Sequence, residues 1–240
     1  MSRERLGSLI SGGGTTMQEI VKASQSRELP LDIAVVISSK EDAGGREKAR
    51  NLGIPEVFID RERFRGDNGR IDQYRFGQEL LRVLREHGAT MVSQNGWLPM
   101  TPDNVIERYR DAIFNQHPGP VPEFGGKGMY GKRVHAAVIM FRRLTKGEMW
   151  SEVIGQRVSP SAYDGGVVLK SERIPIEKDD EVNDLQQRAL PHEHKVQIEM
   201  LKDAATGRLV EVKRDTIIQP GQEAILSQSK KIAQLLYPHG

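Results

Sequence analysis

The 240-residue chain has no cysteine, almost no net charge and no long apolar run, and each absence excludes a class of protein. Without cysteine there is no disulfide, no thiolate catalysis and no thiolate zinc site. Lys and Arg number 35 against 33 Asp and Glu, so binding of nucleic acid or a membrane through bulk charge is not supported. No segment approaches the ~18 apolar residues of a membrane span, and the charged N-terminal stretch is no signal peptide, so we expect a cytoplasmic protein.

Apolar segments alternate with helical patterns along the chain, which is typical of βαβ units around a mainly parallel sheet. The simplest organisation is one α/β domain over residues 1–205 with a C-terminal extension over 206–240. Strands are expected at 6–10, 32–37, 56–59, 90–93 and 111–115, then as antiparallel strands at 151–158 and 167–174, and as one or two short strands in the extension. Helices are expected around 17–23, 46–52, 74–84, 134–144 and 182–202 and ending at 236, with loops at 61–70 and 118–131.

A glycine-rich loop, Ser11-Gly12-Gly13-Gly14-Thr15-Thr16, separates the first strand from its helix. Three glycines let the backbone approach an anion closely, and the helix N-terminus offers free N–H groups and the positive end of its dipole. The loop is not a Walker A motif, and it fails the dinucleotide fingerprint because the third glycine would fall on Met17. Its place at the first βα turn favours a phosphate site over the alternative, a tight turn with a threonine helix cap.

Asn115-Gln116-His117-Pro118 and the distant Asp164-Gly165-Gly166 are the strongest chemical signal. An amide can donate to an oxyanion, an imidazole can move a proton, and a carboxylate can fix the tautomer of the imidazole and raise its basicity. Asn115 and His117 project to the same side of an extended segment, and Pro118 keeps His117 out of the α region. The set predicts acyl-type transfer through a tetrahedral intermediate at the rim of a strand.

Three other motifs are weaker. Gly126 to Lys132 matches a glycine-rich nucleotide string, but it follows a Pro-rich loop and lacks the strand–turn–helix context. His135 is expected to be a packing or capping residue. His192 and His194 lie on different faces of a helix and would not converge on one ion, so no metal is expected.

The chain resembles the folate-dependent formyltransferases over roughly residues 5 to 202. The likeness rests on Ser11 to Gly14, Gly96, Asn115 to Pro118, Lys127 to Gly131, Asp164 to Gly166 and His192 to His194, which occur in the family's order. The resemblance implies a Rossmann-like, doubly wound α/β fold with a mainly parallel mixed sheet. It also implies transfer of the formyl group of 10-formyltetrahydrofolate, as cosubstrate, to the amine of glycinamide ribonucleotide in purine synthesis.

The resemblance further implies a role for each matching position. Asn115, His117 and Asp164 would be catalytic, and Glu193 would contact the ribose of the ribonucleotide. The ribonucleotide phosphate would lie on Gly13, Gly14, Thr15 and Thr16, and the folate on Trp97, Leu98, Pro99, Met100 and Thr101 and on the loop Pro160, Ser161, Ala162, Tyr163 and Asp164. The family usually has a basic residue where Pro99 stands, a histidine where Arg157 stands, and asparagines where Gly13 and Thr16 stand.

Several alternatives share parts of this pattern. Formyltetrahydrofolate hydrolases typically add an N-terminal domain before the first strand, and methionyl-tRNA formyltransferases add a C-terminal barrel that ~35 residues cannot form. Sugar-nucleotide formyltransferases share the catalytic set, and a non-catalytic folate- or nucleotide-binding relative is a further alternative. A dinucleotide-dependent dehydrogenase is disfavoured because the glycine fingerprint fails at Met17. The partners expected are small molecules, with neither nucleic acid nor membrane, and a homodimer is possible.

Overall fold

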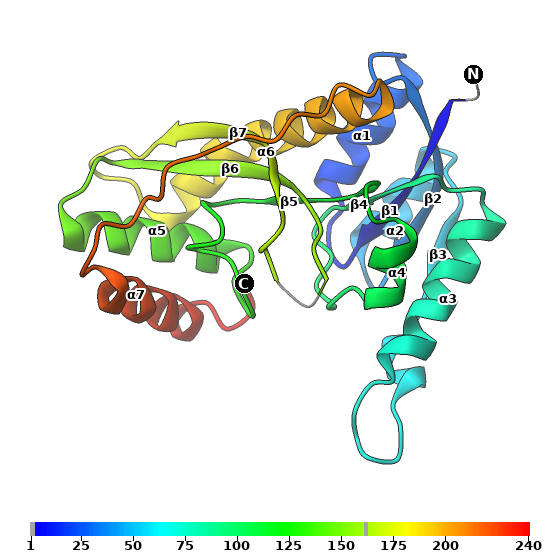
Figure 1. The fold of residues 1–240 in the computed structure, drawn as a ribbon, viewed down its shortest axis with the longest axis horizontal. Helices are drawn as coiled ribbons and strands as arrows, with labels where there is room; N and C mark the ends of the chain where they lie inside the picture. The colour runs from blue at the N-terminus through cyan, green and yellow to red at the C-terminus, as the bar shows by residue number, and fades with distance from the viewer. Residues whose placement is uncertain (1–2, 161–162) are drawn as a thin grey trace. The chain divides into compact units, whose positions relative to one another are not determined.

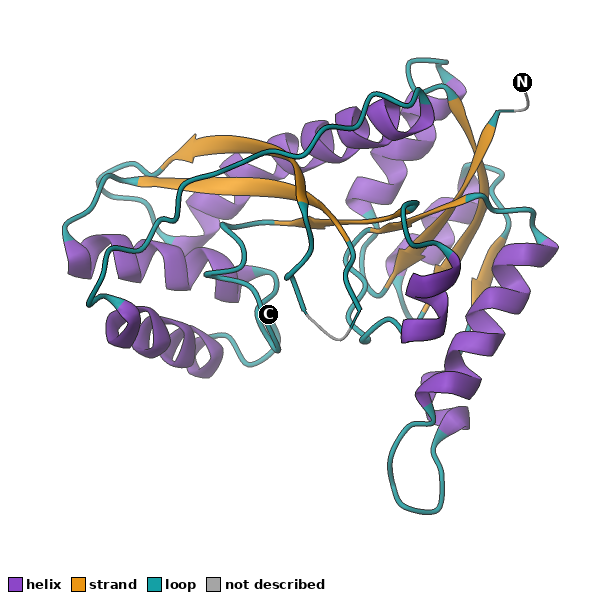
Figure 2. Cartoon of the chain, in the orientation of Figure 1, coloured by secondary structure: helices purple, strands orange, loops and turns teal. Residues whose placement is uncertain are grey.

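The computed structural model describes residues 3–160 and 163–240, and the chain divides into two compact units. Unit 1 comprises Met1–Asn115, Arg157–Ser161 and Gln197–Leu209. Unit 2 comprises Gln116–Gln156, Ala162–Val196 and Val210–Gly240. The strands form a seven-stranded sheet in the order β3-β2-β1-β4-β5-β6-β7 (Figures 1 and 2).

The sheet of unit 1 is parallel and contains β1 (Glu4–Ile10), β2 (Leu31–Ser38), β3 (Glu56–Phe58), β4 (Met91–Gln94) and the start of β5 (Ile113–His117). Such strands are buried on both faces and therefore read as continuous apolar runs, as β2 does. The 3-10 helix η1 (Arg61–Phe64) opens the exposed segment before the third helix.

Helices cover both faces of this sheet. Successive residues of a strand point to opposite faces, so each strand packs against helices on both sides. Ile10 packs with α1 (Thr15–Gln25) and α2 (Gly44–Asn51) through Met17 and Ala49. Leu9 packs with α3 (Gln73–Glu86) and α4 (Asp103–Arg108) through Phe76 and Val105. This two-residue alternation is what makes the unit doubly wound.

Unit 2 is built on an antiparallel pair, β6 (Trp150–Arg157) and β7 (Val168–Pro175), with Ser151 opposite Ile174 in the register. Its helices are α5 (Lys132–Thr145), the first part of α6 (Val182–Ala205) and α7 (Glu223–Leu236). Phe124 and Phe141 meet edge to face at 5.5 Å between ring centroids in its apolar core. α7 lies along α5 and contributes Ala233 to the same core (Figure 1).

The α/β fold with a mainly parallel mixed sheet is confirmed, and three local predictions are corrected. β5 does not end at Asn115 but continues to His117, where Pro118 removes the next backbone donor. α4 was not predicted, because six residues are too few to show helical periodicity. Residues 209–222 form no strand, although Val212 N–H donates a hydrogen bond to the Val168 carbonyl at 2.8 Å.

No helix in the described ranges combines the length and the apolarity that a membrane crossing needs.

Candidate active site

His117 is buried at the end of β5, and its two ring nitrogens face different partners. Nδ1 lies 3.0 Å from the Gly119 carbonyl oxygen. A carbonyl only accepts, so Nδ1 carries a proton and the site of proton exchange is Nε2. Nε2 lies 3.6 Å from Asp164 Oδ2 and has no hydrogen-bond partner among the described residues. The Gly119 carbonyl, and not the carboxylate, therefore sets the tautomer, while Asp164 faces the nitrogen that can react.

Asp164 is held in place by two donors that sequence reasoning did not identify. Gly126 N–H donates to Oδ2 at 3.0 Å, and the Gln156 side-chain amide donates to Oδ1 at 3.1 Å. The backbone of Asp164 is left-handed, with φ of +52°, which costs about 1–3 kcal/mol in a non-glycine residue. A carboxylate with both oxygens hydrogen-bonded, on a backbone held left-handed, has a fixed orientation toward His117.

The turn that approaches Asp164 admits only glycine at one position. A Cβ on Gly125 would lie 2.5 Å from the Asp164 Cβ, closer than packed atoms allow. Gly126 is the first residue of the string Gly126 to Lys132, which resembles a nucleotide-binding loop. The sequence therefore marked this glycine as unusual, but it suggested nucleotide binding and not the hydrogen bond to Asp164. Gln156 gave no such signal, because an internal strand glutamine has no distinctive pattern.

Asn115 precedes His117 by two residues on the same strand and pairs with Gln94 in the β4–β5 register. Alternate residues of a strand share a face, so the amide and the imidazole project in the same direction. Asn115 is partly exposed, whereas His117 is 4% exposed. Both residues lie on β5, as their common face requires, and their joint role stays a prediction.

Glu193 on α6 lies beside the side chain of Gln116, the residue between Asn115 and His117. Burial raises the pKa of the Glu193 carboxyl to about 7, and the Gln116 amide opposes this rise. The neighbouring His192 has a different partner: its Nδ1 lies 2.9 Å from Glu172 Oε1. Glu193 and His192 therefore have different surroundings, the first beside Gln116 and the second against Glu172.

The glycine-rich loop has the backbone expected of an anion site. Gly14 is left-handed with φ of +64°, and a Cβ there would lie 2.8 Å from the Gly45 Cα. Gly45 N–H donates to the Gly12 carbonyl at 3.0 Å. Gly12, Gly13 and Thr15 are exposed, and no described side chain caps α1, so the threonine-cap alternative is wrong.

The segment 97–101 is tied to the glycine-rich loop within unit 1. Leu98 N–H donates to Ser11 Oγ at 2.9 Å, and Ser11 Oγ lies 2.6 Å from Ser39 Oγ. Trp97 is buried and stacks on Phe76 at 6.3 Å between centroids, so its ring is part of the core. The remaining positions are Pro99 and Met100, which are partly exposed, and Thr101, which is buried and accepts from the Gln94 amide.

The predicted loop 160–164 is described only in part. Pro160 and Tyr163 are exposed, and Ser161 and Ala162 lie outside the described residues. Arg157, which stands where the family usually has histidine, lies 3.6 Å from the Asp111 carboxylate. His135 is 1% exposed in α5, a packing residue as predicted, and burial lowers its pKa to about 4.

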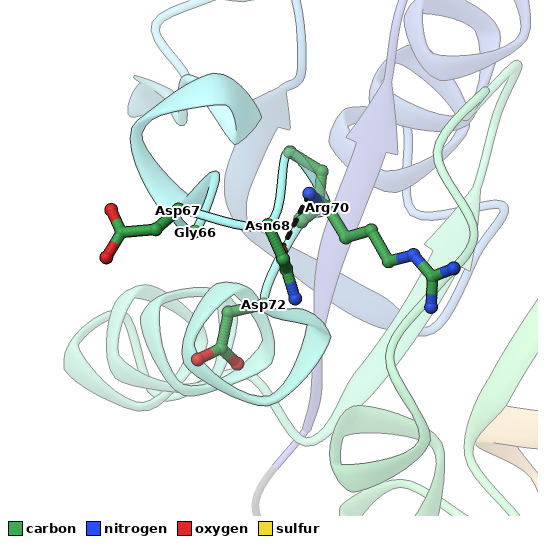
Figure 3. A pocket seen from close by; sticks show the side chains of 6 residues that line it. Gly66, Asp67, Asn68, Arg70 and Asp72 are labelled. Atoms are coloured by element: carbon green, nitrogen blue, oxygen red, sulfur yellow. Dashed lines mark hydrogen bonds between the residues drawn. The ribbon is translucent and has the colours of Figure 1, made fainter.

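A surface pocket lies apart from these residues. A shallow surface pocket is lined by residues of the loop before α3, and none of the predicted site residues lines it (Figure 3). Its lining residues are Gly66, Asp67, Asn68, Arg70, Ile71 and Asp72.

In the described ranges no three His, Asp or Glu side chains gather as a metal site would require, and the absence of a metal stays a prediction.

The chain is similar to known proteins over most of its length. The formyl transferase family model matches residues 4–201. The chain is 31% identical over 199 residues to a chloroplastic phosphoribosylglycinamide formyltransferase of Arabidopsis thaliana, covering 83% of this chain and 64% of that protein. It therefore spans a little under two thirds of the length of this plant relative.

Two other comparisons cover nearly whole proteins. A phosphoribosylglycinamide formyltransferase of Dictyostelium discoideum is 29% identical over 205 residues, which is 82% of this chain and 96% of that protein. The crystal structure of glycinamide ribonucleotide transformylase 1 from Symbiobacterium toebii aligns with a TM-score of 0.74 at 27% identity, covering 88% of this chain and 91% of that chain. With a family model matching well over half of its residues, the chain belongs to the formyl transferase family.

Proposed function

We propose that this protein transfers the formyl group of 10-formyltetrahydrofolate to the amine of glycinamide ribonucleotide. The observation that carries the proposal is the pair of buried His117 and partly buried Asp164, with Nε2 of the imidazole 3.6 Å from a carboxylate whose two oxygens are hydrogen-bonded. Family membership and the names of the relatives support the choice of reaction. Residues 1–205 would form the formyltransferase domain.

The chemistry of these groups fits a direct transfer. The amine attacks the formyl carbon, and the carbonyl electron pair moves to oxygen. The Asn115 amide and the protonated Nε2 of His117 donate to this oxyanion, and removing one such donor typically costs ~3–4 kcal/mol. The nitrogen of the folate then leaves with a proton that the attacking nitrogen has lost. Asp164 supports the positive charge of the imidazolium throughout.

Three groups would bind the two substrates. The ribonucleotide phosphate would lie on the backbone of Gly13, Gly14, Thr15 and Thr16, where an open helix N-terminus favours an anion. Glu193 would accept from a ribose hydroxyl. The folate would lie on residues 97–101 and 160–164, with Leu98 and Tyr163 as the exposed apolar side chains among the described ones. A cytoplasmic location and a homodimer stay predictions.

The test is a steady-state assay with 10-formyltetrahydrofolate and a panel of amines. We expect formyl transfer to glycinamide ribonucleotide, and we expect His117→Ala and Asp164→Asn each to lower kcat by at least about a hundredfold. Circular dichroism and thermal melting control for folding. Turnover like the wild type in both variants would refute the assigned roles. Formate release without any amine would instead identify a hydrolase.

A further inference from the structure

The C-terminal extension reaches the turn that holds Asp164. Lys230, on α7, donates from Nζ to the Glu123 carbonyl at 3.0 Å and to the Gly125 carbonyl at 2.6 Å. Both carbonyls belong to the segment 120–126, which follows the end of β5. All of these residues lie in unit 2. A side chain from the middle of α7 therefore binds the backbone next to the proposed catalytic pair.

One peptide group connects Lys230 to Asp164. The carbonyl of Gly125 accepts from Lys230, and the N–H of the same peptide, on Gly126, donates to Asp164 Oδ2 at 3.0 Å. An ammonium on the carbonyl fixes the plane of this peptide. It also polarises the peptide, because hydrogen bonds in a chain strengthen one another at low dielectric. The N–H is then both better aimed and a stronger donor to the carboxylate.

The electrostatics agree with this connection. Burial lowers the pKa of Lys230, whereas the negative charges of Asp164 and Glu123 raise it. The ammonium thus acts on Asp164 through space as well as through the Gly125–Gly126 peptide. Lys230 is partly buried, while the next residue, Lys231, is exposed.

The rest of the extension is anchored to the same loop. Arg214 donates to the Glu123 carboxylate at 2.9 Å, and the Gln234 amide donates to the Lys127 carbonyl at 3.2 Å. Arg133, at the start of α5, donates in return to the Tyr237 carbonyl at 2.7 Å. Contacts on both sides of Lys230 hold α7 in register with residues 123–127.

We propose that Lys230 is a positioning residue for formyl transfer, acting through the Gly125–Gly126 peptide to hold Asp164 against His117. The proposal rests on the proposed function for its kinetic consequence and gives the C-terminal extension a role. Lys230 touches neither substrate in this scheme. Its loss should therefore lower kcat and leave the KM values of both substrates within about twofold, since only the transition state is affected.

The kinetic test compares Lys230→Met with the matched control Lys231→Met, each alone and combined with Asp164→Asn. We expect Lys230→Met to lower kcat about tenfold, as for loss of a hydrogen bond to a charged group, and Lys231→Met to leave it unchanged. In the Asp164→Asn background Lys230→Met should cost nothing more, because the two residues act as one unit. An equal loss in both backgrounds would overturn the proposal. Lys230→Arg, which keeps the cation, should recover most of the turnover.

A second measurement does not depend on activity. We expect Lys230→Met to speed amide hydrogen exchange at Gly126 about tenfold relative to the wild type and to Lys231→Met. Melting temperatures separate this local effect from global unfolding, and Lys230→Gln, which keeps an N–H donor, replaces the methionine variant if that variant does not fold. Unchanged exchange at Gly126 would overturn the positioning role even if formyl transfer is observed. Absence of transfer in the wild type would overturn the proposed function and leave the exchange result standing.

Discussion

The raised pKa of the buried Glu193 carboxyl predicts how the free energy of unfolding depends on pH. Burial raises the pKa of this carboxyl from 4.5 to about 7. The native state therefore holds a proton on Glu193 more tightly than the unfolded state does. The corresponding stabilisation is complete below pH 4.5 and is lost as the pH rises through about 7, where the native protein must carry a buried charge.

The substitution Glu193→Gln removes this titration and keeps the shape of the side chain. The rise in pKa from 4.5 to about 7 corresponds to at most about 3.5 kcal/mol, at about 1.4 kcal/mol for each pH unit. We expect Glu193→Gln and the wild type to have similar free energies of unfolding near pH 4.5, and the variant to be more stable by up to about 3.5 kcal/mol above pH 7.

The assay is urea unfolding of both proteins across this pH range, with the exposed Glu211→Gln as the control for loss of one negative charge. Other titrating groups act equally on the wild type and the variant, so the difference between them isolates Glu193. A difference that is constant with pH, or one that grows as the pH falls, would refute the argument. Because Glu193 is also proposed to bind the ribose, the more stable variant should have a higher KM for the ribonucleotide.

Two further predictions concern the extension and the glycine-rich loop. Arg214 bridges the carboxylates of Glu123 and Glu152, whose side chains are both 6% exposed. Arg214→Met should therefore lower the free energy of unfolding, measured by urea unfolding, by about 3–5 kcal/mol. A loss below about 1 kcal/mol would contradict a buried charge network. Gly14→Ala should raise the KM for the ribonucleotide at least about tenfold, because left-handed φ and contact with Gly45 both oppose a Cβ; an unchanged KM would place the phosphate elsewhere.

The sequence by itself determined the alternation of strands and helices, because apolar periodicity and glycine turns are local properties. It also placed Asn115 and His117 on one face of a strand, since the two-residue period of a strand needs only the backbone. The glycine-rich turn before α1 was equally readable, because three glycines before a helical pattern have few structural uses. These features depend on neighbours in the chain.

Only the tertiary structure decided what surrounds Asp164. Gly126 is 38 residues from Asp164 in the chain, and Lys230 is 105 residues from Gly125. No periodicity connects such positions, because hydrogen bonds between distant segments depend on how the elements pack. The same holds for the raised pKa of Glu193, which follows from burial and not from its place between two histidines. The sequence therefore indicated which groups are candidates for chemistry, and the packing of Gly126 and Gln156 against Asp164 decided how its carboxylate is held.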